Sequence, residues 1–538
     1  MVGLLFVLQS FTNILPISIN PQRLFSIDVP VLLDIEVQSC YLGWKCTTPP
    51  HWFRHNKELH LGNSWFVKSY LVTQRAEAAE TEIGQRVVLD LALPEDKSTL
   101  PLSIIKDIAE HHDDIEIDPL ETTDNLIRAT NLGWVERDKS AGIWVKYGNY
   151  SYHNKQNTIS QVKVLFGETA RYSVPHWKLL GGSMLFDSPA PRLAIKRGEY
   201  KLPKTPELRF NSESRFKILQ FADLHMSTGN GICDHPVDIL PGEPCIADER
   251  TMEFMDHVLE AEQPDLVVFT GDQIMGDQCP DPETALLKAL SPVIKREVPW
   301  TFVFGNHDSE GPMSNADLMA LGMKLPGCLA SPGGNFSGVG NYMLSVKDHG
   351  KIALDMYFMD SHAYVRVKGV DQHNWIHEDQ LQLMKDLHDT AHKTDSNKPL
   401  SMAFFHIPIP EYRKFAKSNS VGTQREKVEG PIFNSGAFKT LTDLGVSVFT
   451  VGHDHCNDYC MYDDSEASPA WLCYGGGSGE GGYGGYPDKN GDTQRRVRVF
   501  EANSKDLSIT SWKIVRAEAH KLDFQRLVEG GRARFQSS

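Results

Sequence analysis

The chain has 538 residues, of which 41% are hydrophobic and 23% charged, and its formal net charge is -16. This length exceeds that of one ordinary domain and predicts roughly two to four domains. The acidic balance argues against nonspecific nucleic-acid binding, which needs a basic surface to displace counterions from phosphates. No apolar run approaches the ~20 residues of a membrane-spanning helix. We therefore expect a folded multidomain protein with no nucleic-acid partner and no transmembrane span.

The start of the chain does not settle a compartment. An apolar patch, residues 4–8, lies within the first segment, residues 1–20. The first basic residue is Arg23, so the basic n-region of a standard signal peptide is missing. A weak or truncated targeting segment and a buried first strand explain this segment equally well. Acceptor sequences for N-linked glycosylation at Asn149 and Asn335 give weak support to a secretory route, so the cytoplasm and the secretory pathway or vacuole both stay open.

The nine cysteines suggest disulfides rather than a zinc site. The short spacings of Cys40 with Cys46 and of Cys233 with Cys245 suit bridges that close small loops. An odd number of cysteines leaves at least one unpaired. No two of them form the CxxC pair of a structural zinc site.

Residues 21–205 predict a β-rich accessory domain. The strand-like segments are 26–46, 86–93, 142–148 and 162–167. They are rich in the aliphatic and β-branched residues that favour strands. The proline-rich run 188–210 that follows is typical of a linker.

Residues 211–517 predict a second, α/β domain. Short apolar runs alternate there with helical stretches such as 249–263 and 378–393, which is the signature of α/β architecture. The segment 495–515 returns to a strand–turn–strand pattern. The remaining residues, 518–538, are expected to be a charged tail.

Five apolar segments of the second domain each run into polar side chains. The segments end at Asp223-Leu224-His225, Gly271-Asp272, Gly305-Asn306-His307-Asp308, His406 and Gly452-His453-Asp454-His455. Ligands of α/β sheets bind outside the carboxyl ends of strands, so these side chains are predicted to meet at one rim. His453 and His455, two apart on an extended chain, point the same way and either bind something together or crowd each other.

Each of these motifs has an ordinary explanation when taken alone. An aspartate after a strand is usually a helix cap, and an isolated histidine such as His406 is more often a hydrogen-bonded core residue than a ligand. Together they favour another explanation, because polar side chains that shed water at one point are costly unless a partner compensates them. A pair of divalent cations is such a partner, so the set predicts a metal site.

The order DxH, GD, GNHD, H, GHxH resembles that of the calcineurin-like metallophosphoesterase family, over roughly residues 215–515. The segments "FTGDQIMGDQ", "FFHIPIPEY", "GHDHCNDYC" and "YGGGSGEGGYG" resemble its purple-acid-phosphatase-like branch of plants and fungi, especially fungal members. The N-terminal "DIEVQSCYLGWKC" and "LFGETARYSVPHWKLL" are similar to the accessory domain of such a fungal protein. The resemblance implies an α/β fold of four layers, an α/β/β/α sandwich preceded by the β-rich accessory domain.

The resemblance also implies how the ligands divide between two metal ions. One ion would take Asp223, His225 and His455, and the other Asn306, His406 and His453, with the Asp272 carboxylate bridging both. Mixed nitrogen and oxygen ligands fit Fe, Zn or Mn, as a divalent or mixed-valence pair, better than Ca. Two such ions about 3.5–4 Å apart acidify a water and supply a hydroxide that attacks the phosphorus.

The residues His307 and Asp308 are implied to be catalytic rather than ligating. In the family the histidine faces the leaving group, as a general acid or as a stabiliser of transition-state charge, and Asp308 would orient it. The implied activity is hydrolysis of phosphate monoesters, with phosphoproteins favoured as substrates. The alternative is phosphodiester hydrolysis on nucleotides or lipids, since the same metals serve both reactions. An inert scaffold is a further alternative, which the intact ligand set disfavours.

The glycine-rich tract 474–486 contains a formal GxGxxG at 477–482. A dinucleotide site needs a helix directly after this motif, and here further glycines and Pro487 follow. The tract therefore predicts a mobile loop near the rim of the active site, with no dinucleotide bound.

One position departs from the purple acid phosphatase pattern and generates a prediction. Those enzymes have a tyrosine that binds ferric iron three residues after the bridging aspartate, and Met275 stands there in this chain. A thioether cannot replace a phenolate as a ligand of ferric iron. The purified protein carrying iron should therefore lack the tyrosinate charge-transfer band and be nearly colourless, and its preference for Fe(III) should be weaker than that of purple acid phosphatases. An intense purple band in the visible absorption spectrum would contradict this prediction.

Overall fold

The fold is described from a computed structural model. It describes residues 30–41, 46–77, 80–96, 99–111, 122–151, 153–198, 206–237, 239–240, 242–393, 398–484, 494–516 and 520–535. The expected targeting segment, residues 1–20, lies outside these residues. The chain divides into two units. Unit 1 comprises Met1–Lys163, Leu180–Leu185 and Leu193–Tyr200, and unit 2 comprises Val164–Leu179, Phe186–Arg192 and Lys201–Ser538.

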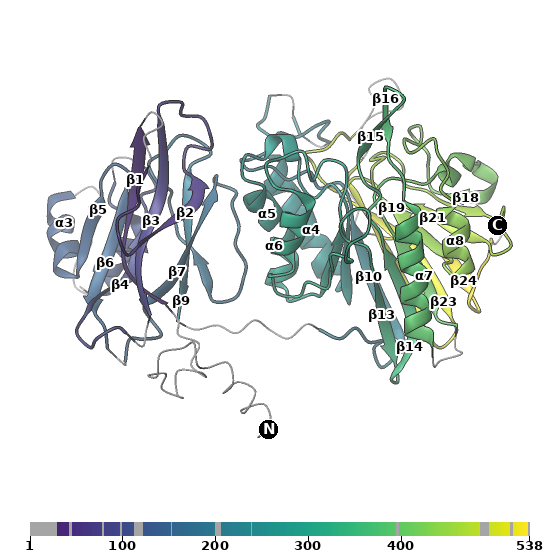
Figure 1. The fold of residues 1–538 in the computed structure, drawn as a ribbon, viewed down its shortest axis with the longest axis horizontal. Helices are drawn as coiled ribbons and strands as arrows, with labels where there is room; N and C mark the ends of the chain where they lie inside the picture. Colours follow the sequence, from purple (N-terminus) through teal and green to yellow (C-terminus); the bar gives the residue numbers. More distant parts are fainter. Residues whose placement is uncertain are drawn as a thin grey trace, which may run out of the picture. The chain divides into compact units, whose positions relative to one another are not determined.

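Unit 1 is built mainly of antiparallel strands (Figure 1). One sheet has the order β1-β3-β2, and another β4-β6-β5. Their strands are β1 (Pro30–Tyr41), β2 (Trp52–Glu58), β3 (Val67–Glu77), β4 (Arg86–Ala92), β5 (Trp134–Asp138) and β6 (Ile143–Asn149). The helices α2 (Leu102–Glu110) and α3 (Thr122–Asn131) share a small core with the second sheet, in which Ile104 and Ile108 are fully buried. The β-rich character predicted for this part of the chain is confirmed.

The linker predicted at 188–210 is partly a strand. A three-stranded sheet of order β7-β9-β8 contains β7 (Ile159–Phe166), β8 (Trp177–Leu179) and β9 (Pro191–Arg197). Strand β9 lies inside the proline-rich run, and its apolar residues 193–195 are buried. Proline at the first position of a strand is compatible with pairing, so the prolines were a misleading signal here.

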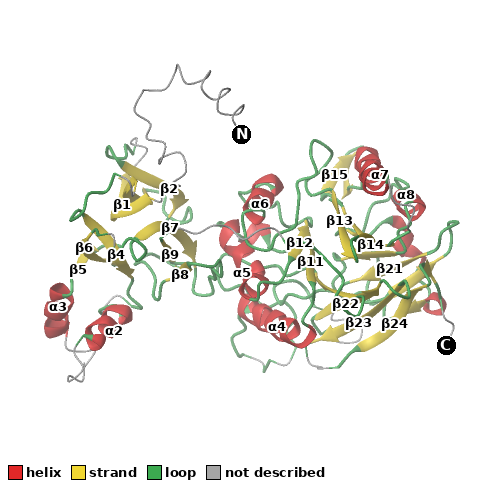
Figure 2. Ribbon diagram, turned by 90° about the horizontal axis from the view of Figure 1, so that it is seen from below, coloured by secondary structure: helices red, strands yellow, loops and turns green. Residues whose placement is uncertain are grey.

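Unit 2 contains two seven-stranded sheets (Figures 1 and 2). The first has the order β12-β11-β10-β22-β23-β24-β25, with β10 to β12 parallel and the rest antiparallel. Its strands are β10 (Arg215–Phe221), β11 (Leu266–Thr270), β12 (Trp300–Val303), β22 (Arg496–Asn503), β23 (Ser508–Val515), β24 (Leu522–Glu529) and β25 (Arg532–Ala533). The second has the order β13-β14-β17-β19-β21-β20-β18, with β14, β17, β19 and β21 parallel. Its strands are β13 (Tyr342–Asp348), β14 (Lys351–Phe358), β17 (Leu400–Phe404), β18 (Ser420–Val421), β19 (Val448–Val451), β20 (Cys460–Asp463) and β21 (Ala470–Tyr474).

Helices cover the outer faces of both sheets. They are α4 (Ala247–Glu262), α5 (Pro282–Lys295) and α6 (Asn315–Gly322) for the first sheet, and α7 (Glu378–His392) and α8 (Ala437–Asp443) for the second. Alternation along β14 separates two cores: Met356 and Phe358 pack toward the first sheet, and Tyr357 packs toward α7 and α8. Figure 2 shows the resulting layers. The four-layer α/β/β/α sandwich is therefore confirmed, and among the described residues no helix is long and apolar enough to cross a membrane.

The segment expected to be a charged tail continues the first sheet. Strand β24 pairs with β23, and Leu527 and Val528 on it are buried. The carbonyl oxygen of Leu527 accepts a hydrogen bond from the indole of Trp471 at 2.7 Å. The tail prediction is wrong because the alternating pattern of this strand is hidden among charged residues that face solvent.

The structure contains three disulfides among its described residues. The predicted pairs Cys40–Cys46 and Cys233–Cys245 are confirmed, and Cys460–Cys473 joins the neighbouring strands β20 and β21. Cys279 and Cys328 form no disulfide. Spacing alone did not reveal the third pair, because strand pairing rather than a short loop brings its two cysteines together.

A buried ion cluster joins the second sheet to the first. Asp458, in the segment between β19 and β20, contacts Arg496 on β22, Lys513 on β23 at 2.9 Å and Arg425 at 2.7 Å. Burial alone would raise the pKa of Asp458, but the charges of these three cations and the hydrogen bond from Lys513 hold it well below its ordinary value. The carboxylate is therefore ionised at neutral pH and fixes the chain that follows the motif GHDH.

We expect Asp458→Asn to lower the free energy of unfolding of unit 2 by about 3–5 kcal/mol at neutral pH, because it leaves buried cations uncompensated. The pKa of Asp458 is lowered in the folded state, so its stabilisation is present above about pH 4 and is lost as the pH falls further. Urea unfolding at several pH values measures both effects. The control Asp443→Asn removes a partner of the exposed Lys439 and should change stability little, and equal effects of the two substitutions would contradict the assignment.

Candidate metal centre

The candidate ligands follow the carboxyl ends of strands in both sheets of unit 2. Strands β10, β11 and β12 lead to Asp223, His225, Asp272 and Asn306, and strands β17 and β19 lead to His406, His453 and His455. We expected these five strands to form the rim of one sheet, but they belong to two sheets. Strands β13 and β14, which lie between β12 and β17 in the chain, are the first strands of the second sheet. The side chains still come together at one place.

The candidate ligands form two adjacent groups. The groups are Asp223, His225 and His455, and Asp272, His406 and His453, and within each the candidate ligand atoms lie within 4.8 Å of one another. Nε2 of His225 lies 3.1 Å from Nε2 of His455 and 3.8 Å from Oδ2 of Asp272, so Asp272 lies near both groups. Asn306 joins the second group, with Oδ1 3.1 Å from Nε2 of His406.

The donor atoms fit metal ions in both type and spacing. Nδ1 of His406 donates to the carbonyl oxygen of Thr270 at 2.8 Å, so Nε2 would present its lone pair to an ion that displaced the proton from this nitrogen. Oδ1 of Asn306 and Oδ2 of Asp272 lie 3.1 and 3.2 Å from that Nε2, so three acceptors converge. Ligand atoms that share one ion at ~2.1 Å are about 3.0–3.4 Å apart. A cation satisfies all three acceptors, and the mixture of nitrogen and oxygen suits Fe, Zn or Mn.

The pKa values of the same residues indicate that the cluster of buried carboxylates is stabilised by positive charge. Burial lowers the pKa of His406, but the charge and hydrogen bond of Asp272 outweigh it and raise the pKa to about 10. Burial raises the pKa of Asp223 to about 8, although the charge of His406 opposes this. Nδ1 of His225 is buried without a hydrogen-bond partner, and burial lowers the pKa of that ring to about 3. Protons on His406 and Asp223 therefore supply the positive charge that a metal ion would otherwise provide to neutralise the carboxylates.

Four of the candidate ligands have left-handed backbone. The φ angles are 55° at Asp223, 50° at His225, 53° at Asp272 and 73° at His453. Such angles cost a residue with a side chain about 1–3 kcal/mol and persist where the surroundings impose them, commonly at functional sites. The strain turns each side chain off its strand and into the shared space.

The glycines beside the ligands provide space. A Cβ atom at Gly305 would lie 2.1 Å from Oδ1 of Asp272, and one at Gly271 would lie 2.3 Å from Nδ1 of His406. Gly271 also has a positive φ of 92°, as expected for a tight turn. Close approach of a ligand from another strand is thus the reason for Gly305, which sequence alone did not show.

The predicted catalytic pair is arranged differently from the expectation. Asp308 does not orient His307: its carboxylate accepts hydrogen bonds from the amides of Gly305, Asp272 and Ile274 at 2.7, 3.0 and 3.1 Å. Nδ1 of His307 instead donates to Glu310 at 2.6 Å. Burial lowers the pKa of His307, but Asp272 and Glu310 outweigh it and raise the pKa. The carboxylate three residues along the chain was the available signal for this partner.

The glycine-rich tract supports His455 and is held in place itself. Nδ1 of His455 donates to the carbonyl oxygen of Tyr483 at 2.9 Å, and the two rings stack with centroids 3.9 Å apart. A Cβ at Gly482 would lie 2.4 Å from the ring of His455. The position near the site agrees with the prediction, but residues 475–484 are mostly buried and hydrogen-bonded, so the expectation of a mobile loop is wrong for them.

A third group of similar composition, formed by Asp355, His388 and His392, differs in its contacts. His392 bonds directly to Asp355 at 2.6 Å, which is too short for two ligands of one ion. Nδ1 of His388 is hydrogen-bonded to the hydroxyl of Tyr357 at 2.6 Å. The donors of this group satisfy its acceptors, so it is a hydrogen-bonded anchor between α7 and β14.

The fold and the site define a class of protein. Residues 216–457 match the family model of the Calcineurin-like phosphoesterase. Among curated proteins, the chain is 40% identical to "Phosphatase DCR2" of Saccharomyces cerevisiae, over 70% of this chain and 68% of that protein. The chain belongs to the calcineurin-like phosphoesterase family.

Other relatives come from plants. The chain is 34% identical to "Probable inactive purple acid phosphatase 29" of Arabidopsis thaliana, over 62% of this chain and 88% of that protein. Among solved structures, the purple acid phosphatase PPD1 of yellow lupin aligns with 71% of each chain at 12% identity and a TM-score of 0.37. The plant relative at 34% identity confirms the purple-acid-phosphatase-like resemblance seen in the sequence.

We expect the purified protein to carry close to two metal ions per chain, measured by plasma mass spectrometry, and chelation to lower its Tm, because the ions bind only the folded cluster. Asp272→Asn should reduce the metal content. The matched control His392→Ala, in the hydrogen-bonded anchor, should leave it at two. A protein that binds neither Mn, Zn nor Fe, with a Tm that added metal does not change, would contradict the metal centre.

Proposed function

We propose that unit 2 is a dinuclear-metal-dependent phosphatase that hydrolyses phosphate monoesters, with phosphoproteins as its substrates. The observation that carries this proposal is the convergence of buried acceptors around Nε2 of His406. Asp223, His225 and His455 would hold one ion, and Asn306, His406 and His453 the other, with Asp272 between them. Two ions held by these residues would acidify a water for attack and would neutralise phosphate oxygens.

The proposed role of His307 concerns the leaving group. Its ring lies 5.3 Å from that of His225, centroid to centroid, and is partly exposed, whereas all of the proposed ligands except His453 are buried. Because Nδ1 is committed to Glu310, Nε2 is the atom that can give a proton to a departing oxygen. Asp308 would act at a distance, by holding the loops that carry Asp272 and Asn306 together.

One relative's name favours a second candidate, an inert scaffold. The plant protein at 34% identity is called probably inactive. An inert fold need not keep all seven donors within reach of two ions, and this chain keeps them. A comparison of monoester and diester substrates distinguishes the proposed phosphatase from a phosphodiesterase. The absence of a nucleic-acid partner stays a prediction.

The discriminating assay compares nitrophenyl phosphate with bis-nitrophenyl phosphate, with Mn, Zn or Fe supplied. We expect higher kcat/KM for the monoester and no turnover in Asp272→Asn, because Asp272 lies near both metal-binding groups. Preference for the diester would favour nucleotide or lipid substrates. Bound metal with no turnover of any phosphomonoester, phosphopeptides included, would favour the scaffold.

The role of His307 can be tested through the leaving group. His307→Ala should lower kcat/KM for a phosphoserine peptide by about 10²–10⁴, the range for general acid catalysis, and for nitrophenyl phosphate much less, since nitrophenolate leaves without a proton. Glu310→Gln should act in the same direction by a smaller factor. Equal losses on both substrates would assign His307 to charge stabilisation instead.

A further inference from the structure

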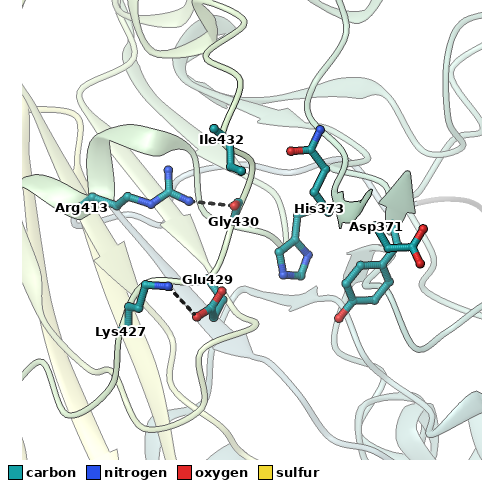
Figure 3. A pocket seen from close by; sticks show the side chains of 9 residues that line it. Asp371, His373, Arg413, Lys427, Glu429, Gly430 and Ile432 are labelled. Atoms are coloured by element: carbon teal, nitrogen blue, oxygen red, sulfur yellow. Dashed lines mark hydrogen bonds and ion pairs between the residues drawn. The ribbon is translucent and has the colours of Figure 1, made fainter. Parts of the chain in front are cut away.

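Figure 3 shows a pocket of unit 2 whose volume is about 540 Å³. One wall is the hairpin of β15 (Tyr364–Val367) and β16 (Val370–His373), and the other is the loop 427–432. The ring of His373 meets that of His453 edge-on, with centroids 4.7 Å apart. The pocket therefore begins next to a proposed metal ligand.

The charged groups of the pocket are balanced and engaged. Arg413 donates to the carbonyl oxygens of residues 430–431 at 2.7 and 2.8 Å, and Lys427 contacts Glu429 at 3.3 Å. Figure 3 shows both cations on the side opposite Asp371. Together with Glu429 and Asp371, these two cations leave no net positive charge in the lining. This lining disfavours a nucleoside polyphosphate or a phosphoinositide headgroup, which bring additional negative charge.

Two of the side chains that line the pocket are apolar or aromatic and exposed. Tyr364 is 58% exposed and Ile432 is 80% exposed. Single exposed apolar residues are common on protein surfaces, but a pair that faces one pocket offers a contact for an apolar side chain of a ligand. Most of the other lining residues are polar or charged, so the pocket lacks the wholly apolar interior that a lipid chain would need.

We propose that this pocket binds the polypeptide segment next to the phosphorylated residue of a substrate. An apolar side chain of the substrate lies against Ile432 and Tyr364, and its backbone groups pair with the polar lining, which offers both donors and acceptors. The continuity with the metal centre through His373 places this segment beside the scissile phosphate. This inference rests on the proposed phosphatase activity and adds a substrate preference to it.

The test compares two phosphoserine peptides that differ only in leucine or serine beside the phosphoserine. The wild-type protein should prefer the leucine peptide by about tenfold in kcat/KM, the scale of a few methylene groups in an apolar contact. Ile432→Ser should abolish this preference and lower the ratio of peptide to nitrophenyl phosphate kcat/KM by about tenfold. The matched control Ile232→Ser removes an isoleucine that is 82% exposed on the loop before α4, and should keep the wild-type ratio.

The possible outcomes distinguish failure of the proposed peptide binding in the pocket from failure of the proposed phosphatase activity. Wild-type selectivity in Ile432→Ser, or a higher kcat/KM for a nucleoside monophosphate than for either peptide, would overturn the pocket while leaving the phosphatase intact. If the metal-loaded protein hydrolyses no monoester, the proposed function fails. Binding of a fluorescent phosphonate analogue of the leucine peptide then still reports on the pocket: a tenfold weaker Kd in Ile432→Ser supports it, and an unchanged Kd overturns it.

Discussion

The structure of unit 2 depends on one electrostatic constraint, which is that buried carboxylate, amide and imidazole groups converge at a point where they need shared positive charge. Around Nε2 of His406, the oxygens of Asn306 and Asp272 approach within 3.1 and 3.2 Å. Burying such groups without compensation would cost several kcal/mol each, so the arrangement is stable only with added positive charge. Hydrogen bonds to Thr270 and Tyr483 aim the imidazole lone pairs of His406 and His455 into this space.

Local strain at the ligands is tolerated because rigid surroundings impose it. Four ligands take left-handed backbone, which no helix or strand propensity favours. The restraints are specific: the carboxylate of Asp308 binds three amides from two loops, and Asp458 ties the chain after His455 to cations on β22 and β23. Both anchors lie outside the set of candidate ligands: Asp308 joins the loops after β11 and β12 of the first sheet, and Asp458 joins the second sheet to the first.

The sequence predicted that the candidate ligands would meet because each follows a buried apolar strand, a signal local to ten residues. It predicted the loop-closing disulfides for the same reason. What it missed was long-range: the pairing of Cys460 with Cys473 across strands, the ring of Tyr483 on His455, and the replacement of Asp308 by Glu310 as partner of His307. The final strands were missed because β24 buries few residues and carries charges outward. The family resemblance supplied the four layers, which no local pattern fixes.

Hydrogen bonds connect the pocket to the candidate metal centre. The loop that forms one pocket wall runs beside the segment between β19 and β20: the amide of Glu429 donates to Asp454 at 3.3 Å, and Glu426 accepts from the amide of Cys456 at 2.6 Å. Asp454 itself stands between His453 and His455 and accepts from the hydroxyl of Tyr474 at 2.5 Å. A displacement of the loop would therefore be transmitted to two candidate ligands. Contacts made by a substrate's flanking residues can in this way favour the ligand geometry, which couples recognition of the substrate to the chemistry at its phosphate.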